Sequence, residues 1–130
     1  MRKEHAKHNE AACDYLIESG EFNDWVVTTA FYSALHYLQH DLFPLEFKDA
    51  TYNNFNDYCN SLSNVINEKP SRHNEQIKLV GMRLPNCNKF YRWLFDECMK
   101  ARYNNYKVSD SVAKQARKTL DNIKLQLNKV

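Results

Sequence analysis

The segment Asp24-Trp25-Val26-Val27-Thr28-Thr29-Ala30-Phe31-Tyr32-Ser33-Ala34-Leu35-His36-Tyr37-Leu38-Gln39-His40 carries the strongest structural signal in the chain. At ~100° per residue, one helix face collects apolar side chains, namely Val27, Phe31, Ala34, Leu35, Leu38 and Leu42. A neighbouring face collects aromatic and polar side chains, namely Trp25, Thr29, Tyr32, His36 and His40. This pattern predicts a helix that is covered on two sides and forms the centre of a helical bundle. Its polar stripe is where we expect any chemistry.

Composition supports an all-α fold in a single domain spanning residues 1–130. Glycine occurs only 2 times and proline 3 times in 130 residues, which is too few for the tight turns of an antiparallel sheet. The net charge of +2 is too small to indicate nucleic-acid binding by itself. The 4 cysteines form no Cys-x-x-Cys pair, so we expect free thiols packed as small apolar side chains.

No apolar run reaches the ~18 residues that a membrane span needs. The basic N-terminus is not followed by the apolar stretch of a signal peptide. We therefore expect a cytoplasmic protein with no membrane association.

Periodicity predicts four main antiparallel helices over residues 2–19, 24–43, 86–103 and 109–127, with a further helix over 71–84. Gly20 should end the first helix and Asn23 or Asp24 should cap the second. Ser71 should cap the helix that Pro85 closes. Residues 45–69 give a weaker pattern, because five asparagines lower helix propensity around a short helix expected at 55–66.

The last predicted helix has a basic outer side, formed by Lys114, Arg117, Lys118 and Lys124. A solvated helix face is the plainer interpretation of this pattern. Contact with a nucleic-acid backbone is the alternative.

Three blocks of the sequence resemble the HEPN family of small bacterial and archaeal helical domains. They are Asp24–Tyr37 with its Ala-Phe-Tyr-Ser-Ala-Leu-His run, Ser71–Gln76 with its Ser-Arg-His start, and Tyr91–Tyr103 with Tyr-x-x-Leu followed by Ala-Arg-Tyr. The resemblance implies a HEPN-like bundle in which residues 45–69 are an insertion relative to compact members. It also implies a homodimer, and either a metal-independent ribonuclease or a non-catalytic partner of a nucleotidyltransferase-type protein.

The chain departs from the ribonuclease pattern of that family. Ribonuclease members carry an Arg followed four to six residues later by a His, and no such pair follows Arg72 here. The one numerical match, Arg2 to His8, lies on the first predicted helix. This departure favours a module that is non-catalytic or weakly catalytic.

Candidate catalytic residues are Arg72, His73 and Arg102, because imidazole titrates near neutrality and guanidinium grips phosphate through two nitrogens. For each, a buried or solvated structural role is the alternative. Candidate binding residues are Tyr32, His36, Arg92 and Tyr103.

No metal and no other cofactor is expected. His36 and His40 have helical i, i+4 spacing, but no glutamate lies between them and no third ligand is identifiable. A phosphate-binding glycine loop is also missing.

The sequence therefore predicts a HEPN-like module that recognises a nucleotide, RNA or partner protein, in a toxin–antitoxin or defence system. A metal-independent endoribonuclease with an Arg/His site in a dimer cleft is the first alternative. A purely structural dimerising protein is the second.

Overall fold

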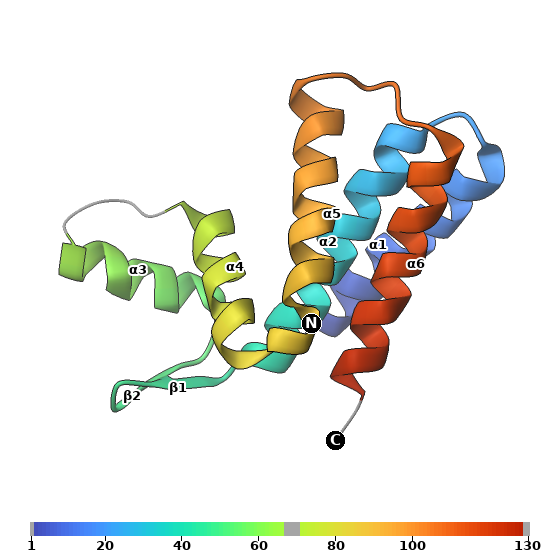
Figure 1. Cartoon of the computed structure of the whole chain (residues 1–130). Helices are drawn as coiled ribbons and strands as arrows, with labels where there is room; N and C mark the ends of the chain where they lie inside the picture. Colours follow the sequence, from blue (N-terminus) through green and yellow to red (C-terminus); the bar gives the residue numbers. More distant parts are fainter. Residues whose placement is uncertain (1, 67–70, 129–130) are drawn as a thin grey trace.

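The chain forms a bundle of long helices with a smaller helical arm at its side, as the computed structural model shows for residues 2–66 and 71–128 (Figure 1). The elements in chain order are α1 (Arg2–Ser19), α2 (Asn23–Leu42), β1 (Leu45–Phe47), β2 (Ala50–Tyr52), α3 (Phe55–Ile66), α4 (Arg72–Arg83), α5 (Pro85–Tyr103) and α6 (Asp110–Leu127). The predicted all-α bundle is confirmed. Its four long helices are α1, α2, α5 and α6, and α3 and α4 are the two short ones.

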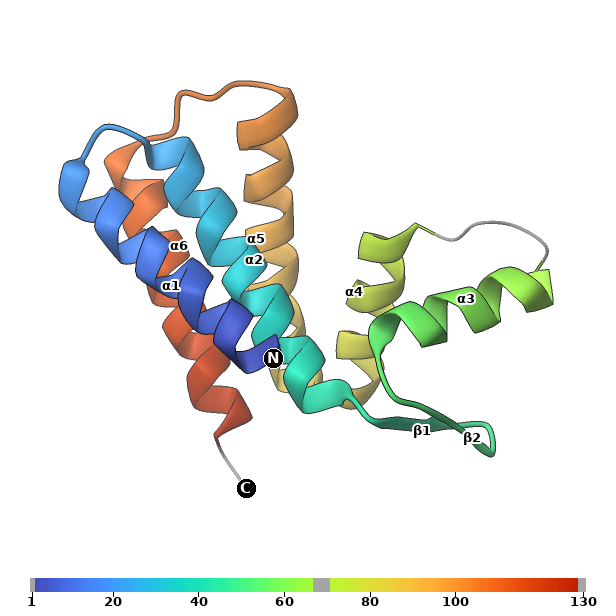
Figure 2. The ribbon, with the colours of Figure 1, turned by 180° about the vertical axis from the view of Figure 1, so that it is seen from behind.

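Helix α2 is the centre of the bundle, as its double stripe predicts. It packs against α1, α5 and α6 and touches α4 (Figures 1 and 2). Of the predicted apolar stripe, Leu35 is half-buried and the other members are buried. The polar stripe is graded: Trp25 is 52% exposed, whereas Tyr32 and His36 are half-buried. The apolar side thus holds the bundle together, and the other side stays partly open.

Local signals fix most helix ends. Gly20 adopts a φ of 70°, which favours glycine at a helix end. Ser71 and Ser109 cap α4 and α6, and each side chain accepts a hydrogen bond from the backbone N–H three residues on. The predicted cap of α2 is wrong, because Phe22 holds that position without a side-chain bond. The Asn23 amide instead donates to the Val108 carbonyl at 3.0 Å, which ties the α1–α2 turn to the α5–α6 loop.

The arm begins with a β-hairpin that the sequence analysis did not predict. Strands β1 and β2 pair antiparallel, with Phe47 opposite Ala50. Lys48 and Asp49 between them both have positive φ, at 51° and 63°, as a two-residue hairpin turn requires. The expected short helix follows as α3. Pro85 does not simply close α4, since it also begins α5 directly after Leu84.

The expectation of a solvated basic face on α6 is wrong for two of its four members. Arg117 donates to Asp14 at 2.6 Å, to Asp121 at 2.8 Å and to Glu10 at 2.8 Å. Lys124 donates to Glu10 at 2.9 Å. These contacts form a half-buried ion-pair network between α1 and α6, while Lys114 and Lys118 remain exposed.

All four cysteines are buried free thiols, as expected. Within the described ranges, no helix is both long and apolar enough to cross a membrane.

Candidate functional site

A pocket of about 430 Å³ lies where the arm meets the bundle. Its walls come from α2, from α4, from the start of α3 and from the first residue of α1, and the two views show the arm standing beside the bundle (Figures 1 and 2). The lining residues are Arg2, Tyr32, Leu35, His36, Gln39, Phe55, Asn56, Arg72, His73 and Gln76. Four of the seven predicted site residues, Tyr32, His36, Arg72 and His73, therefore share one pocket.

Arg72 and His73 reach the pocket because they occupy the first turn of α4, directly after the Ser71 cap. The exposed Arg72 guanidinium donates from Nη2 to Asn56 Oδ1 at 2.7 Å. This bond links α4 to α3. It also fixes the direction of the guanidinium while leaving its other nitrogens for a ligand.

A chain of amide hydrogen bonds supports the pocket from within. Arg2 donates to Gln39 on α2, and Gln39 donates to Gln76 on α4. Gln76 then donates back to the Leu35 carbonyl at 3.1 Å. Both glutamines are almost fully buried, so each depends on these partners. The chain holds α4 against α2 and anchors Arg2 at the mouth of the pocket.

The two histidines of the pocket are neutral at pH 7. Burial, with the charges of His5 and Arg2, lowers the pKa of His36 to about 4. Its Nδ1 is buried without a hydrogen-bond partner, and its ring stacks on His5 with centroids 3.8 Å apart. Burial, with the Arg102 guanidinium, also lowers the pKa of His73. A neutral imidazole at the pocket can accept a proton or a hydrogen bond from a ligand.

Aromatic rings surround His73 on the bundle side. Its ring centroid lies 5.6 Å from that of Phe31, 5.5 Å from that of Phe95 and 6.5 Å from that of Tyr32. Arg102 joins this group from α5 by donating to the Tyr32 hydroxyl at 2.9 Å. Arg102 thus reaches the site through Tyr32 rather than by lining the pocket.

Two predicted binding residues lie away from the pocket. Tyr103 is 69% exposed near the end of α5, where the Arg102 guanidinium lies 5.3 Å from its ring centroid. Arg92 is exposed on the same helix and lines none of the pocket walls. Their sequence neighbours Tyr91 and Ala101 face the core, which turns Arg92 and Tyr103 to other sides of α5.

Sequence reasoning missed Arg2, Gln39, Asn56 and Gln76. A signal existed for the two glutamines. Gln76 lies three residues after His73 and four before the buried Val80, so it is a polar residue on an inward helix face. Nothing local marked Arg2 or Asn56, which arrive from other elements through the tertiary fold.

The charge of the pocket is one-sided. Arg2 and Arg72 line it, and Arg102 lies behind Tyr32, whereas its described lining contains no aspartate or glutamate. An unbalanced cluster of guanidinium groups beside neutral hydrogen-bonding side chains attracts anions, phosphate above all. In the part of the chain that the structure describes, no group of three metal-ligating side chains is found. His36 stacks on His5, and His40 lines a different hollow.

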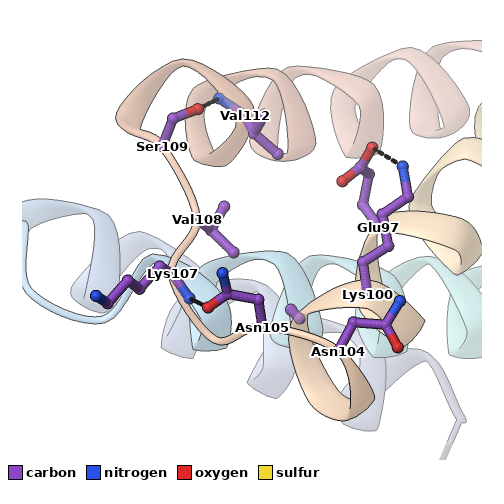
Figure 3. Close-up of a pocket in the computed structure, with 9 residues that line it drawn as sticks. Glu97, Lys100, Asn104, Asn105, Lys107, Val108, Ser109 and Val112 are labelled. Carbon is purple, nitrogen blue, oxygen red and sulfur yellow. Dashed lines mark hydrogen bonds and ion pairs between the residues drawn. The ribbon is translucent and has the colours of Figure 1, made fainter.

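A separate hollow of about 330 Å³ lies under the α5–α6 loop (Figure 3). Its polar side chains are largely satisfied by one another. Lys100 pairs with Glu97 at 3.4 Å, Asn105 accepts from the Lys107 N–H, and Ser109 accepts from the Val112 N–H. This hollow therefore lacks the unbalanced charge of the pocket beside α4.

Comparison of the chain with protein-family models, with curated proteins and with solved structures finds no match in any of the three. The interpretation of the pocket therefore rests on its own geometry and chemistry.

Proposed function

We propose that the chain is a HEPN-like module, non-catalytic or weakly catalytic, that binds the phosphate group of a nucleotide or RNA in the pocket between α2 and α4. One observation carries this proposal: two arginines and two neutral histidines meet at a pocket whose described lining holds no carboxylate. Phosphate favours such a site, because guanidinium offers paired N–H donors that match its oxygens. Tyr32 and Phe55 add aromatic surface for the rest of a nucleotide.

The direct test is calorimetric titration of adenosine 5′-monophosphate (AMP) into the protein at low salt. We expect Arg72→Gln to weaken AMP binding by about 10-fold, which is a loss of ~1.4 kcal/mol. The melting temperature should stay unchanged, because Arg72 is exposed and its one side-chain hydrogen bond goes to Asn56.

Arg92→Gln is the matched control, because it removes the same charge from an exposed position outside the pocket. Equal losses in both variants would indicate only a general charge effect and would contradict the proposal. So would a wild-type protein that does not bind AMP.

Ribonuclease activity is the second candidate function, and the state of His73 favours it. Its lowered pKa keeps the imbidazole ring neutral at pH 7, as a general base requires. In this mechanism His73 takes the proton of an RNA 2′-hydroxyl, whose oxygen attacks the neighbouring phosphorus. The 5′-oxygen then leaves with a proton, and Arg72 and Arg102 stabilise the charged phosphate.

Incubation of labelled RNA with the protein in EDTA separates the two functions. Cleavage that His73→Gln abolishes and the exposed-site control His8→Gln preserves would support the enzyme. Binding without cleavage would support the module.

The homodimer, the nucleotidyltransferase-type partner and the toxin–antitoxin setting belong to the same proposal. Light scattering of the purified chain tests the dimer. A monomer at working concentration would contradict both the dimer-cleft nuclease and the purely structural dimer.

A further inference from the structure

A second basic hollow lies on the other side of the first turns of α1. It measures about 370 Å³, and its cationic lining is Lys3, Lys7 and His40, with Lys124 beside them. Lys124 is neutralised by its contact with Glu10 at 2.9 Å. Lys3 and Lys7 are exposed and form no ion pair within the described residues.

The acidic groups around this hollow are few and mostly committed. Asp41 is the one acid in its described lining. Glu10 is held by Lys124 and Arg117. Glu4, which lies between the two lysines in the sequence, interacts with the chain's N-terminal amino group as well as with the charge of Lys7. A positive surface therefore remains at Lys3 and Lys7.

The two hollows follow one another along the same two helices. On α1, Arg2 lines the first and Lys3 lines the second. On α2, His36 lines the first and His40 lines the second. Four residues of helix advance about 6 Å, so the two sites are roughly one helical turn apart. The stacked His5–His36 pair lies between them.

We propose that the second hollow is a second phosphate subsite, and that the ligand is a single-stranded oligonucleotide whose successive backbone phosphates occupy the two hollows. This inference rests on the proposed function and specifies its ligand. A nucleoside separates successive backbone phosphates, which suits two sites divided by a helical turn. The phosphates of a nucleoside triphosphate share bridging oxygens and lie closer together, so they suit a single pocket better.

The test compares three ligands, AMP, ATP and a single-stranded oligoadenylate of four nucleotides, by titration at several salt concentrations. The double variant Lys3→Gln/Lys7→Gln should bind the oligoadenylate at least 10-fold more weakly and AMP within twofold of wild type. The salt slope for the oligoadenylate should fall by ~0.7 for each lost phosphate contact. Melting temperatures verify that the variant is folded.

The matched control is Lys114→Gln/Lys118→Gln, which removes two exposed lysines from α6. We expect the control to bind all three ligands like wild type. An equal loss in the control, an equal loss of AMP binding in the double variant, or no loss at all would overturn the second subsite.

A selective loss of ATP binding would assign the subsite to a triphosphate and overturn the oligonucleotide. Failure of wild-type protein to bind AMP would overturn the proposed function itself, and the second subsite with it. Tight AMP binding without any gain for the oligoadenylate would overturn the second subsite alone.

Discussion

The α1–α6 interface and the α2–α4 pocket use charged side chains in opposite ways. At the interface, Arg117 meets Glu10, Asp14 and Asp121, so a half-buried cation is balanced by carboxylates. In the pocket, Arg2 and Arg72 have amide oxygens of the protein as their hydrogen-bond partners. Balanced charges join two helices, whereas unbalanced charges are available for a ligand.

The pKa values of the two regions follow the same division. Burial opposes ionisation of Glu10, but the Tyr37 hydroxyl, Lys124 and Arg117 outweigh it and hold the pKa of Glu10 below its ordinary value. In the pocket, burial and neighbouring cations lower the pKa of His36 and His73, and no carboxylate opposes them. The interface thus stabilises its charges, while the pocket keeps its histidines neutral.

The largest expected effect comes from removing the hub of the interface. Arg117→Met keeps aliphatic packing but leaves three carboxylates without their common partner. We expect the free energy of unfolding to fall by about 2 kcal/mol, below the cost of a fully buried pair because the site is partly solvated. Urea unfolding measures it, with the exposed Lys118→Met as control. Equal behaviour of the two variants would show that the network is only a surface feature.

The next effect is a pH dependence that originates in the pocket. The pKa of His36 is about 4 in the folded state, below its ordinary value of 6.5. As pH falls below about 6.5, the unfolded chain therefore takes up a proton first and stability is lost towards pH ~4. His73 acts in the same direction.

Replacing His36 by phenylalanine should remove most of that dependence. Between pH 7 and about 4.5, we expect wild type to lose roughly 1–2 kcal/mol more than His36→Phe, after allowance for partial exposure. Thermal unfolding at a series of pH values measures the difference, with His8→Gln as the exposed control. Parallel curves for wild type and His36→Phe would mean that His36 is not held neutral by the fold.

The smallest effect concerns the direction of Arg72. Asn56→Ala removes the acceptor at 2.7 Å that holds the guanidinium, but leaves the charge. We expect AMP binding to weaken about threefold, or ~0.7 kcal/mol, with no change in unfolding. The exposed neighbour Asn53→Ala should bind like wild type. If Asn56→Ala binds AMP as tightly as wild type does, Arg72 needs no positioning.

The fold could be predicted further than the site because helix periodicity is a local property. The α2 stripe and the serine caps gave the bundle and most helix ends. The hairpin escaped because each strand has three residues and its Lys48-Asp49 turn lacks the glycine that usually marks one. The basic face of α6 misled because a periodic pattern does not reveal that Arg117 lies opposite Glu10 and Asp14.

The site shows the same limit. Periodicity placed Tyr32 and His36 on one face of α2, and the structure adds Arg72 and His73 from α4. Arg2 and Asn56 belong to elements far away in the sequence, so only the tertiary fold brings them to the pocket.

The most direct test of the central claim is a chemical-shift map of the ¹⁵N-labelled protein titrated with AMP. The account predicts that the largest shifts cluster at Tyr32, His36, Arg72 and His73, and that the amides of the α5–α6 hollow and of Arg117 stay unchanged. Shifts centred on the α5–α6 hollow or on the α1–α6 interface, or no shifts at all, would contradict it.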